Sequence, residues 1–526
     1  MTSRIADPEP ASAIAVAPTQ SEDVDPAPES ADETTPGEPQ SALNTGLRWN
    51  MVGRPVIEAA NLLAVVVLAR LVAPAEFGRY SIALIVLLLA CVPTQAVMYA
   101  LVQRGEIDRD HLKTGQTLAI LLGLAVCAFS VAASYTIVPV LFGARTAVLV
   151  RLMLPACFIN SVNTVQYALI NRRLEFRRLS VFDMTVTLVC AGVSIPLAAM
   201  GLSGEAMVLG VDAGSVAGFI LICCWILPPV PNFRLRAARD ILRPGIPAAS
   251  NAASLICFQN CDYVIIGARV GPLLAGYYFR AYTLGVVYQM KVSQVVTSIG
   301  FPVLSRVPSE DEVNRLRERM VQTITLILFP LLTALAIVAP KFVTWFYGPA
   351  WHAVIVPVQI LTFGGAAMLL AQTVTVAMLA TGRARTVMLW GWGHFLAYGA
   401  VVFVVARLGL SAVAIAAVAV HTTFLIISYV LLARGRIRLS LKALANDVLP
   451  AGASSIGLAA VAVPVSIVTM NIPVLPYLFI IALAGGAGYF LTLRLWFPTH
   501  LHRLGSLARR LLPARVYRLR LGLSSR

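Results

Sequence analysis

Charged residues are scarce in this sequence of 526 residues. Asp, Glu, Lys and Arg together make up 13% of the chain, whereas soluble domains carry about 25%. Apolar residues make up 58%, and the mean hydropathy is +0.80. So few polar side chains do not cover the surface of a water-soluble fold of this size. The composition therefore excludes a soluble protein and predicts a chain that lies mostly in a lipid bilayer.

The sequence also lacks the motifs of metal sites and of common enzymes. Its eight cysteines fall in apolar runs, and none forms a CxxC pair or a His/Cys cluster with metal spacing. A Walker loop, GxSxG and HExxH are all missing, and no long loop between apolar segments carries paired carboxylates. We therefore expect no enzyme activity, no bound metal and no cofactor.

Long apolar segments fill most of the chain. Fourteen of them are long enough to cross a hydrocarbon core of about 30 Å at 1.5 Å per residue. They predict an all-α integral membrane protein with 14 transmembrane helices. The predicted spans are 47–71, 79–101, 115–138, 147–170, 179–200, 204–227, 246–269, 279–303, 320–339, 353–379, 386–406, 410–433, 448–470 and 473–493.

Basic residues alternate from loop to loop along this series of spans. With the N-terminus inside, the inner loops and the C-terminal tail hold 29 Lys and Arg residues, and the outer ends hold eight. This bias follows the positive-inside rule, so we expect both termini in the cytoplasm. It also accounts for the net charge of +16 without a nucleic-acid partner.

An internal repeat divides the helices into two sets. The pattern PxxxGxYxxA at 74–83 returns at 272–281, and the triplet GLS at 201–203 returns at 409–411. Each repeating unit holds six predicted helices, an even number, so both copies share one orientation in the membrane. We therefore expect two six-helix bundles related by a pseudo-twofold axis along the membrane normal, followed by two extra C-terminal helices.

The repeat and the two ends of the chain give a domain plan. The N-terminal segment is rich in Pro, Ala and acids, so we expect a disordered cytoplasmic tail. The basic C-terminal segment favours binding to anionic inner-leaflet lipids, and a merely solvated flank is the alternative. The plan is a tail at 1–43, a six-helix bundle at 44–230, a cytoplasmic linker at 231–245, a second bundle at 246–435, helices 13 and 14 at 446–494 and a basic tail at 495–526.

Lys291 is the sharpest candidate for a functional residue. It lies 11 residues from Arg280 and 15 from Arg306, so the nearer end of its helix is roughly 16 Å away along the axis. A lysine stem does not reach that far, so the ammonium group must face a wet cavity or a carboxylate. Two interpretations follow: contact with an anionic group of a substrate, or a structural ion pair.

Polar residues share one face of the predicted helix at 246–269. Gln259 and Asn251 lie 3 and 11 residues before Asp262, so the three side chains align at helical spacing. We expect this face to look into the bundle or into a cavity. Asp262 then has three candidate roles: a partner for Lys291, a carrier of a coupling proton, or an acceptor of hydrogen bonds that order the outer half of its helix.

Arg54, Glu58 and Asn61 share a face of the first predicted span. Arg54 and Glu58 are four residues apart, and an ion pair at that spacing lowers the cost of burial. The planar guanidinium of Arg54 also suits a phosphate, while its place near the inner third lets it reach the cytoplasm. The first and seventh helices correspond in the repeat, so these residues and Asp262 would flank the same cleft.

Other polar residues in the spans have simpler interpretations. His394 and His421 are single histidines in apolar helices, and such histidines are more often packing groups than proton relays. Tyr278 and Tyr282 suit stacking on sugars, but aromatic residues at helical spacing usually pack in the core or anchor at the interface. We expect packing roles for all four residues.

Several short motifs occur in a characteristic order along residues 44–435. They are ARLVAPAEFG at 69–78, ALVQR at 100–104, NRRLEFRR at 171–178, DYVIIG at 262–267, FPVLSR at 301–306 and GPAW at 348–351. With these motifs the chain resembles the Wzx-type polysaccharide flippases of the MOP exporter superfamily.

The resemblance implies a carrier in the bacterial inner membrane. Such a carrier moves an undecaprenyl-pyrophosphate-linked oligosaccharide unit from the inner to the outer leaflet, by alternating access between two six-helix lobes. A gradient of H⁺ or Na⁺ is the implied driving force, and polysaccharide polymerase and export proteins are the implied protein partners. Cationic cavity residues of the family are taken to meet the pyrophosphate, and by location that role falls to Lys291 and Arg54.

Two other functions are compatible with the same architecture. One is a carrier of the same superfamily with a different cargo, either a multidrug antiporter or a flippase for peptidoglycan precursors. The cations Lys291 and Arg54 argue against cationic drugs as the cargo. The other is a scaffold of an envelope complex that transports nothing, in which the two charged tails are docking arms.

Overall fold

The computed structural model of the chain describes residues 38–287, 289, 310–380, 383–432 and 440–501. Within these residues the chain is helical and contains no strand. Its N-terminal half holds α1 (Glu38–Leu71), α2 (Pro74–Ala90), α3 (Val92–Gln103), α4 (Arg109–Tyr135), α5 (Ile137–Phe142), α6 (Ala144–Leu152), α7 (Leu154–Val162), α8 (Thr164–Arg172), α9 (Phe176–Ala199) and α10 (Gly204–Trp225).

The rest of the chain is built in the same way. It holds α11 (Leu235–Val270), α12 (Pro272–Tyr282), the π-helix η1 (Thr283–Val287), α14 (Glu310–Tyr347), the 3₁₀ helix η2 (Pro349–Val354), α15 (Ile355–Ala380), α16 (Ala384–Val405), the 3₁₀ helix η3 (Ala406–Leu408), α17 (Leu410–Leu432), α18 (Leu441–Val468) and α19 (Val474–Trp496). We call α12 to α17 the C-terminal half.

The predicted membrane spans coincide with these helices. Ten helices of the described segments are long and apolar enough to cross a membrane, and the bent pair α2 and α3 makes an eleventh. The predicted spans 47–71 and 246–269 fall on α1 and α11, which are not among these ten helices, and the span 279–303 begins in α12 and continues outside the described residues. An all-helical, multi-pass membrane protein is thereby confirmed, while the count of fourteen stays a prediction.

Helix ends follow local sequence signals. Pro74 and Pro272 occupy the first turns of α2 and α12, where a missing N–H costs no helical hydrogen bond. Gly271, between α11 and α12, has a φ of +102°, a conformation that favours glycine. Asp108 caps α4, because its carboxylate accepts a hydrogen bond of 2.8 Å from the backbone N–H of His111.

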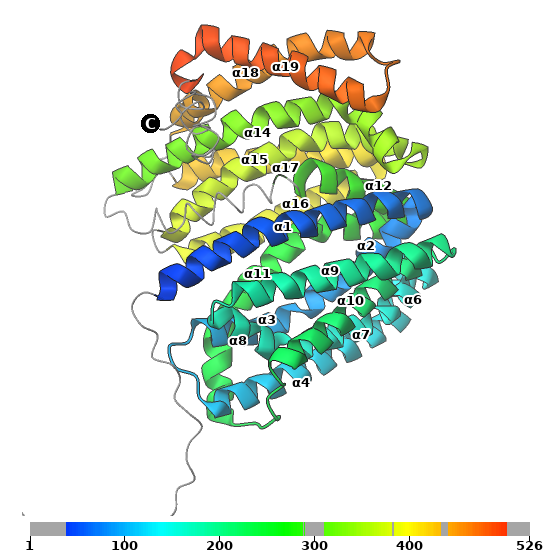
Figure 1. Cartoon of the computed structure of the whole chain (residues 1–526), viewed down its shortest axis with the longest axis vertical. Coiled ribbons are helices and arrows are strands. Elements are labelled where there is room, and N and C mark those ends of the chain that lie inside the picture. The colour runs from blue at the N-terminus through cyan, green and yellow to red at the C-terminus, as the bar shows by residue number, and fades with distance from the viewer. Residues whose placement is uncertain (1–37, 288, 290–309, 381–382, 433–439, 502–526) are drawn as a thin grey trace, which may run out of the picture.

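The helices lie side by side in three groups, as Figure 1 shows. The N-terminal half occupies the lower part of that view, the C-terminal half lies above it, and α18 and α19 run along the top. The two last helices pack against α14, where the Tyr489 hydroxyl donates to the carbonyl oxygen of Leu326 at 2.8 Å. They are therefore an addition to one side of the C-terminal half.

Helix α11 belongs to the cores of both halves. Near its start, Ala238 and Ile241 are buried in one apolar cluster with Val97 and Leu101 of α3. Near its end, Phe258, Cys261, Tyr263 and Ile266 join the large apolar cluster that contains most of the C-terminal core and also residues of α1 and α2. Two prolines, at 244 and 247, separate these parts. The segment 231–245, which we predicted to link the bundles, is thus helical from Leu235 onward.

Candidate functional site

The predicted site residues lie in different surroundings. Lys291 is outside the described residues, and so is the side chain of Arg54, whose backbone belongs to α1. Glu58 of α1 and Gln259 of α11 are half-buried, Asn61 and Asn251 are exposed, and Asp262 is fully buried. Asp262 therefore differs in burial from Asn251, which shares its predicted helix face. Its contacts in the interior define the candidate site.

Asp262 accepts hydrogen bonds from a tyrosine and from the backbone. The Tyr398 hydroxyl of α16 donates to Oδ2 at 2.9 Å, and the backbone N–H of Tyr263 donates to Oδ1 at 2.9 Å. The Tyr398 oxygen also lies 3.2 Å from the hydroxyl oxygen of Tyr278 in α12. Among the described residues Asp262 forms no ion pair, and the donors to its carboxyl in that part of the chain are neutral.

Two histidines pack beside this network, toward α17. The Nε2 atom of His394 lies 3.2 Å from Nδ1 of His421, which is 1% exposed. The ring of His421 packs on that of Tyr398, with centroids 4.9 Å apart, and His394 stacks on Phe424 at 4.1 Å. The predicted packing role is visible in these ring contacts. The contact between the two imidazoles was not predicted, because no periodicity in the sequence joins α16 to α17.

The network combines groups that exchange protons. The carboxyl and the two hydroxyls are hydrogen-bonded and buried, and the two imidazoles, of which His394 is half-buried, adjoin them through the packing of His421 on Tyr398. A buried carboxyl in a membrane protein usually marks an ion or proton pathway. No cluster of three or more His, Cys, Asp or Glu side chains suited to a metal ion occurs in the described part of the chain.

The two halves meet where α2 and α12 begin. A Cβ atom on Gly78 would lie 1.8 Å from the carbonyl oxygen of Pro272, and one on Gly276 would lie 1.9 Å from that of Pro74. Each glycine thus faces the backbone at the start of the other helix. This reciprocity is what a twofold relation between α2 and α12 produces, and the four residues belong to the repeated sequence pattern.

Aromatic residues seal this contact. Trp351 of η2 is fully buried, and its Nε1–H donates to the carbonyl oxygen of Ala69 in α1 at 2.8 Å. Its indole packs edge-on against Phe77 of α2 at 5.3 Å, and the guanidinium of Arg280 lies 4.0 Å from the centre of the Phe77 ring. The halves are therefore closed on each other at the end of the molecule that carries Pro74 and Pro272.

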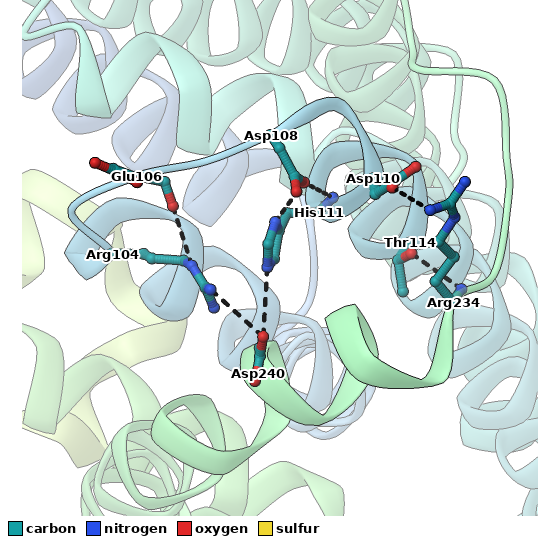
Figure 2. Close-up of polar contacts among 8 residues, drawn as sticks. All are labelled: Arg104, Glu106, Asp108, Asp110, His111, Thr114, Arg234 and Asp240. Atoms are coloured by element: carbon teal, nitrogen blue, oxygen red, sulfur yellow. Dashed lines mark hydrogen bonds and ion pairs between the residues drawn. The ribbon is translucent and has the colours of Figure 1, made fainter. Parts of the chain in front are cut away.

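A polar cluster joins α11 to the N-terminal half at the opposite helix ends (Figure 2). Asp240 of α11 lies 3.4 Å from the Arg104 guanidinium and 3.7 Å from Nε2 of His111. Arg234 pairs with Asp110 at 2.7 Å. Partly exposed ion pairs of this kind contribute about 0–1 kcal/mol each. The buried contacts of Ala238 and Ile241 therefore hold the start of α11 more strongly than the charges do.

Asp108 lies at the edge of this cluster, outside the membrane-spanning segments. Its carboxylate accepts hydrogen bonds from the backbone N–H of His111 and from the ring of the same residue. The backbone hydrogen bond is the main reason why the pKa of Asp108 is below its usual value of 3.8. Asp108 thus stays ionised at neutral pH, where it caps α4.

These features define an all-helical, multi-pass membrane protein. The chain superposes on the lipid II flippase MurJ in an inward closed conformation with a TM-score of 0.68, at 14% identity, over 87% of this chain and 99% of that one. A multidrug resistance MATE family transporter of the MOP superfamily, in an inward-facing conformation, gives 0.58 at 16% identity, over 74% and 95% of the two chains.

The sequence identifies the family more narrowly. The family model described as polysaccharide biosynthesis protein matches residues 67–356, and the chain belongs to this family. Its relatives include the lipopolysaccharide biosynthesis protein WzxC of Escherichia coli K12, 26% identical over 334 residues, and the teichuronic acid biosynthesis protein TuaB of Bacillus subtilis 168, 25% identical over 316 residues. The predicted resemblance to polysaccharide flippases is thereby confirmed.

A third relative is the succinoglycan biosynthesis transport protein ExoT of Rhizobium meliloti, 25% identical over 327 residues. The three alignments cover 61%, 59% and 60% of this chain and 66%, 65% and 65% of WzxC, TuaB and ExoT respectively. The chain thus matches slightly less than two thirds of the length of each relative.

Proposed function

We propose that the protein carries a lipid-linked oligosaccharide unit, attached through undecaprenyl pyrophosphate, from the inner to the outer leaflet of a bacterial inner membrane. The product pathway is an exopolysaccharide, an O-antigen or a capsule. The observation that carries this proposal is the family match over 67–356, because relatives in it are named for three different cell-surface polysaccharides. The MurJ-like fold supports a flippase rather than an enzyme.

The proposed mechanism is alternating access between two bundles of six helices, with two further helices at one side. The repeat and the reciprocal contact of Gly78 and Gly276 support a pseudo-twofold axis between the bundles. The surplus of Lys and Arg near Arg104 and Asp240 supports a cytoplasmic position for that end and for both termini. The sealed Trp351 end would then be the outer gate, and the head group would load from the cytoplasm.

The site residues divide into three proposed tasks. Lys291 and Arg54 would bind the pyrophosphate, while Glu58, Asn61, Asn251 and Gln259 would line the path of the head group. Asp262 would couple transport to a gradient of H⁺ or Na⁺, which is supported by its burial among neutral donors. Binding a coupling ion there would change the charge of a buried network between α11 and α16, and that change would bias the gate.

The proposed partners follow from the same function. The basic tail would bind anionic lipids of the inner leaflet, and polysaccharide polymerase and export proteins would receive the flipped unit. The acidic tail at 1–43 is proposed to lie in the cytoplasm.

Deleting the protein tests the proposal. The lipid-linked unit should accumulate on the cytoplasmic side and polymer export should stop, in a strain without a redundant carrier. In proteoliposomes, the purified protein should translocate the extracted lipid-linked unit but not cationic dyes. Unchanged export with no accumulated intermediate would overturn the proposal, and transport of dyes alone would favour a drug antiporter.

A further inference from the structure

A small polar pocket lies inside the N-terminal half. It opens between the bend at Cys91, where α2 and α3 meet at 42°, the junction of α7 with α8, and the start of α9. Its volume is about 160 Å³, and Thr94, Gln95, Asn160, Asn163, Tyr167 and Phe182 are among the residues that line it. No ionisable group other than the Cys91 thiol and the Tyr167 phenol is among the lining side chains.

Asn163 is the group that points to a ligand. Its side chain is within a residue that is 4% exposed, and neither its oxygen nor its nitrogen has a hydrogen-bond partner among the described residues. Buried amides are almost always paired, so an unpaired one calls for a partner that the chain does not supply. The amide offers both an acceptor and donors. A hydroxyl group, which accepts and donates at one atom, satisfies both.

The other lining residues narrow the chemistry. The pocket holds no Lys, Arg or His, so a pyrophosphate has no cation there, and it holds no carboxylate, so a metal ion has no strong ligand. Amides and hydroxyls surround an aromatic corner, in which Tyr167 and Phe182 meet edge-to-face at 5.6 Å. A pyranose is a neutral ring with hydroxyls at its edge and C–H bonds on its faces. It therefore matches both the polar side chains and the aromatic corner of the pocket.

The position and size of the pocket agree with this ligand. Thr94 and Asn163 lie ten and nine residues before Arg104 and Arg172, on helices that run toward the end proposed to load the head group. A cavity of about 150 Å³ holds a ring the size of benzene; a hexose is larger, so its outer hydroxyls would lie in the open mouth of this pocket of about 160 Å³. Polar backbone and side chains at membrane depth are tolerated where they line a wet cavity, and the bend at Cys91 opens such a place.

We propose that this pocket binds one neutral sugar ring of the transported head group, which would add a recognition site separate from the cations that meet the pyrophosphate. This proposal rests on the proposed function. It predicts that the carrier distinguishes lipids with the same pyrophosphate by their sugar.

Two probes with one difference test it: undecaprenyl diphosphate, and the same lipid bearing a single glucose or galactose. Binding to the purified full-length protein in detergent is measured by thermal shift and by native mass spectrometry. A hexosyl form should bind about tenfold more tightly than the bare diphosphate, a difference of about 1.4 kcal/mol. Asn163→Leu should remove this difference and leave binding of the bare diphosphate unchanged, which also shows that the variant is folded.

Matched variants separate recognition from packing. Gln359→Leu makes the same chemical change in α15, where the amide donates to the carbonyl oxygen of Ala336 at 2.8 Å, and should keep the preference for the hexosyl lipid. Gln95→Leu alters the pocket at a half-buried residue and should weaken the preference even if Asn163→Leu fails to fold.

The outcomes distinguish the two proposals. Equal binding of hexosyl and bare lipids by the unmodified protein would overturn the sugar pocket and leave the carrier function in place. A preference that survives in both pocket variants would also overturn the pocket. Binding of neither lipid would reject the carrier function and the pocket together.

Discussion

The indole N–H of Trp351 donates to the carbonyl oxygen of Ala69, a residue 282 positions earlier in the chain. Ala69 is in the last turn of α1, where carbonyl groups have no helical N–H to accept from. The indole therefore completes the end of a helix in the other half of the molecule. One hydrogen bond thus serves both the end of α1 and the closure between the halves.

Replacing this indole should loosen the closure. Trp351→Phe keeps a ring against Phe77 but leaves the Ala69 carbonyl without its donor, which costs about 1–3 kcal/mol. A cysteine at the buried position Ala275, introduced as Ala275→Cys, should then react faster with a membrane-impermeant maleimide. Trp390→Phe removes an indole that packs on Phe424, away from this contact, and should leave labelling unchanged. If the maleimide labels the cysteine at the same rate in Trp351→Phe and Trp390→Phe, the role of Trp351 in closing the gate is contradicted.

The glycine contact should tolerate no side chain. Gly78→Ala and Gly276→Ala place a methyl group 1.8 Å and 1.9 Å from backbone oxygens that have no rotamer to change, so overpacking should cost about 1–3 kcal/mol or more. We expect a lower Tm in detergent for each variant. Gly393→Ala, whose added Cβ has no neighbour within 4 Å, should be neutral or slightly stabilising. Wild-type Tm values for both contact variants would refute the close approach of α2 and α12.

Asp262 should be required for coupling and dispensable for folding. Asp262→Asn retains an acceptor for Tyr398 but does not ionise, so the protein should reach normal membrane levels and lose its response to an imposed H⁺ or Na⁺ gradient in proteoliposomes. Tyr398→Phe should lower stability by about 1 kcal/mol. Asp212→Asn, the same change at a carboxyl that accepts from Ala156 in the N-terminal half, should keep the gradient response. Gradient-driven transport by Asp262→Asn would exclude the coupling role.

Acid should remove the contribution of Asp108 to stability. Its pKa is lower in the folded protein than its usual value of 3.8, so its contribution is complete above that value and disappears as the pH falls through the folded pKa. Asp108→Asn keeps a capping acceptor without ionising. The Tm of the wild type should therefore exceed that of Asp108→Asn at pH 7, and the difference should shrink as the pH falls below 3.8. A difference that stays constant from pH 7 to pH 3 would show that ionisation of Asp108 is irrelevant.

Lys291 remains the strongest prediction from sequence alone. Lys291→Ala should abolish transport at normal membrane levels, and Lys291→Arg should retain part of the activity, because the site needs a cation for the pyrophosphate. Loss of folded protein in Lys291→Ala would instead indicate a structural ion pair, since removing one partner of a buried pair costs about 3–5 kcal/mol. Unchanged polysaccharide export in cells that carry Lys291→Ala, with no lipid translocation by the purified protein, would favour the scaffold.

The helices were predictable because a bilayer imposes length and composition on every span. The predicted span 410–433 begins at the same residue as the observed α17, Leu410–Leu432, because Gly409, with a φ of +102°, breaks the chain before it. The surroundings of Asp262 were not predictable in the same way. Its donor Tyr398 is 136 residues away, and helical periodicity says which residues share a face but not which faces of separate helices meet.

The polar pocket was invisible in the sequence for a related reason. Asn163 and Thr94 are ordinary uncharged residues in apolar helices, and neither spacing nor charge marks them. Only the bend at Cys91 and the packing of α8 and α9 bring them to one cavity. Charged residues draw attention in a membrane sequence because burying them is costly, so a site built from neutral amides leaves almost no trace.

Because α11 packs in the cores of both halves, it matters where the protein is divided into fragments. A chain divided in the loop before Leu235 would strip Ala238 and Ile241 from the core that they complete with Val97 and Leu101. Inserting one residue between the two prolines would turn everything beyond it by about 100° and pull the two ends of the helix out of step. The boundary between the halves therefore falls inside helix α11 and not in a flexible loop. Split or circularly permuted versions of the protein should have their new ends at another position.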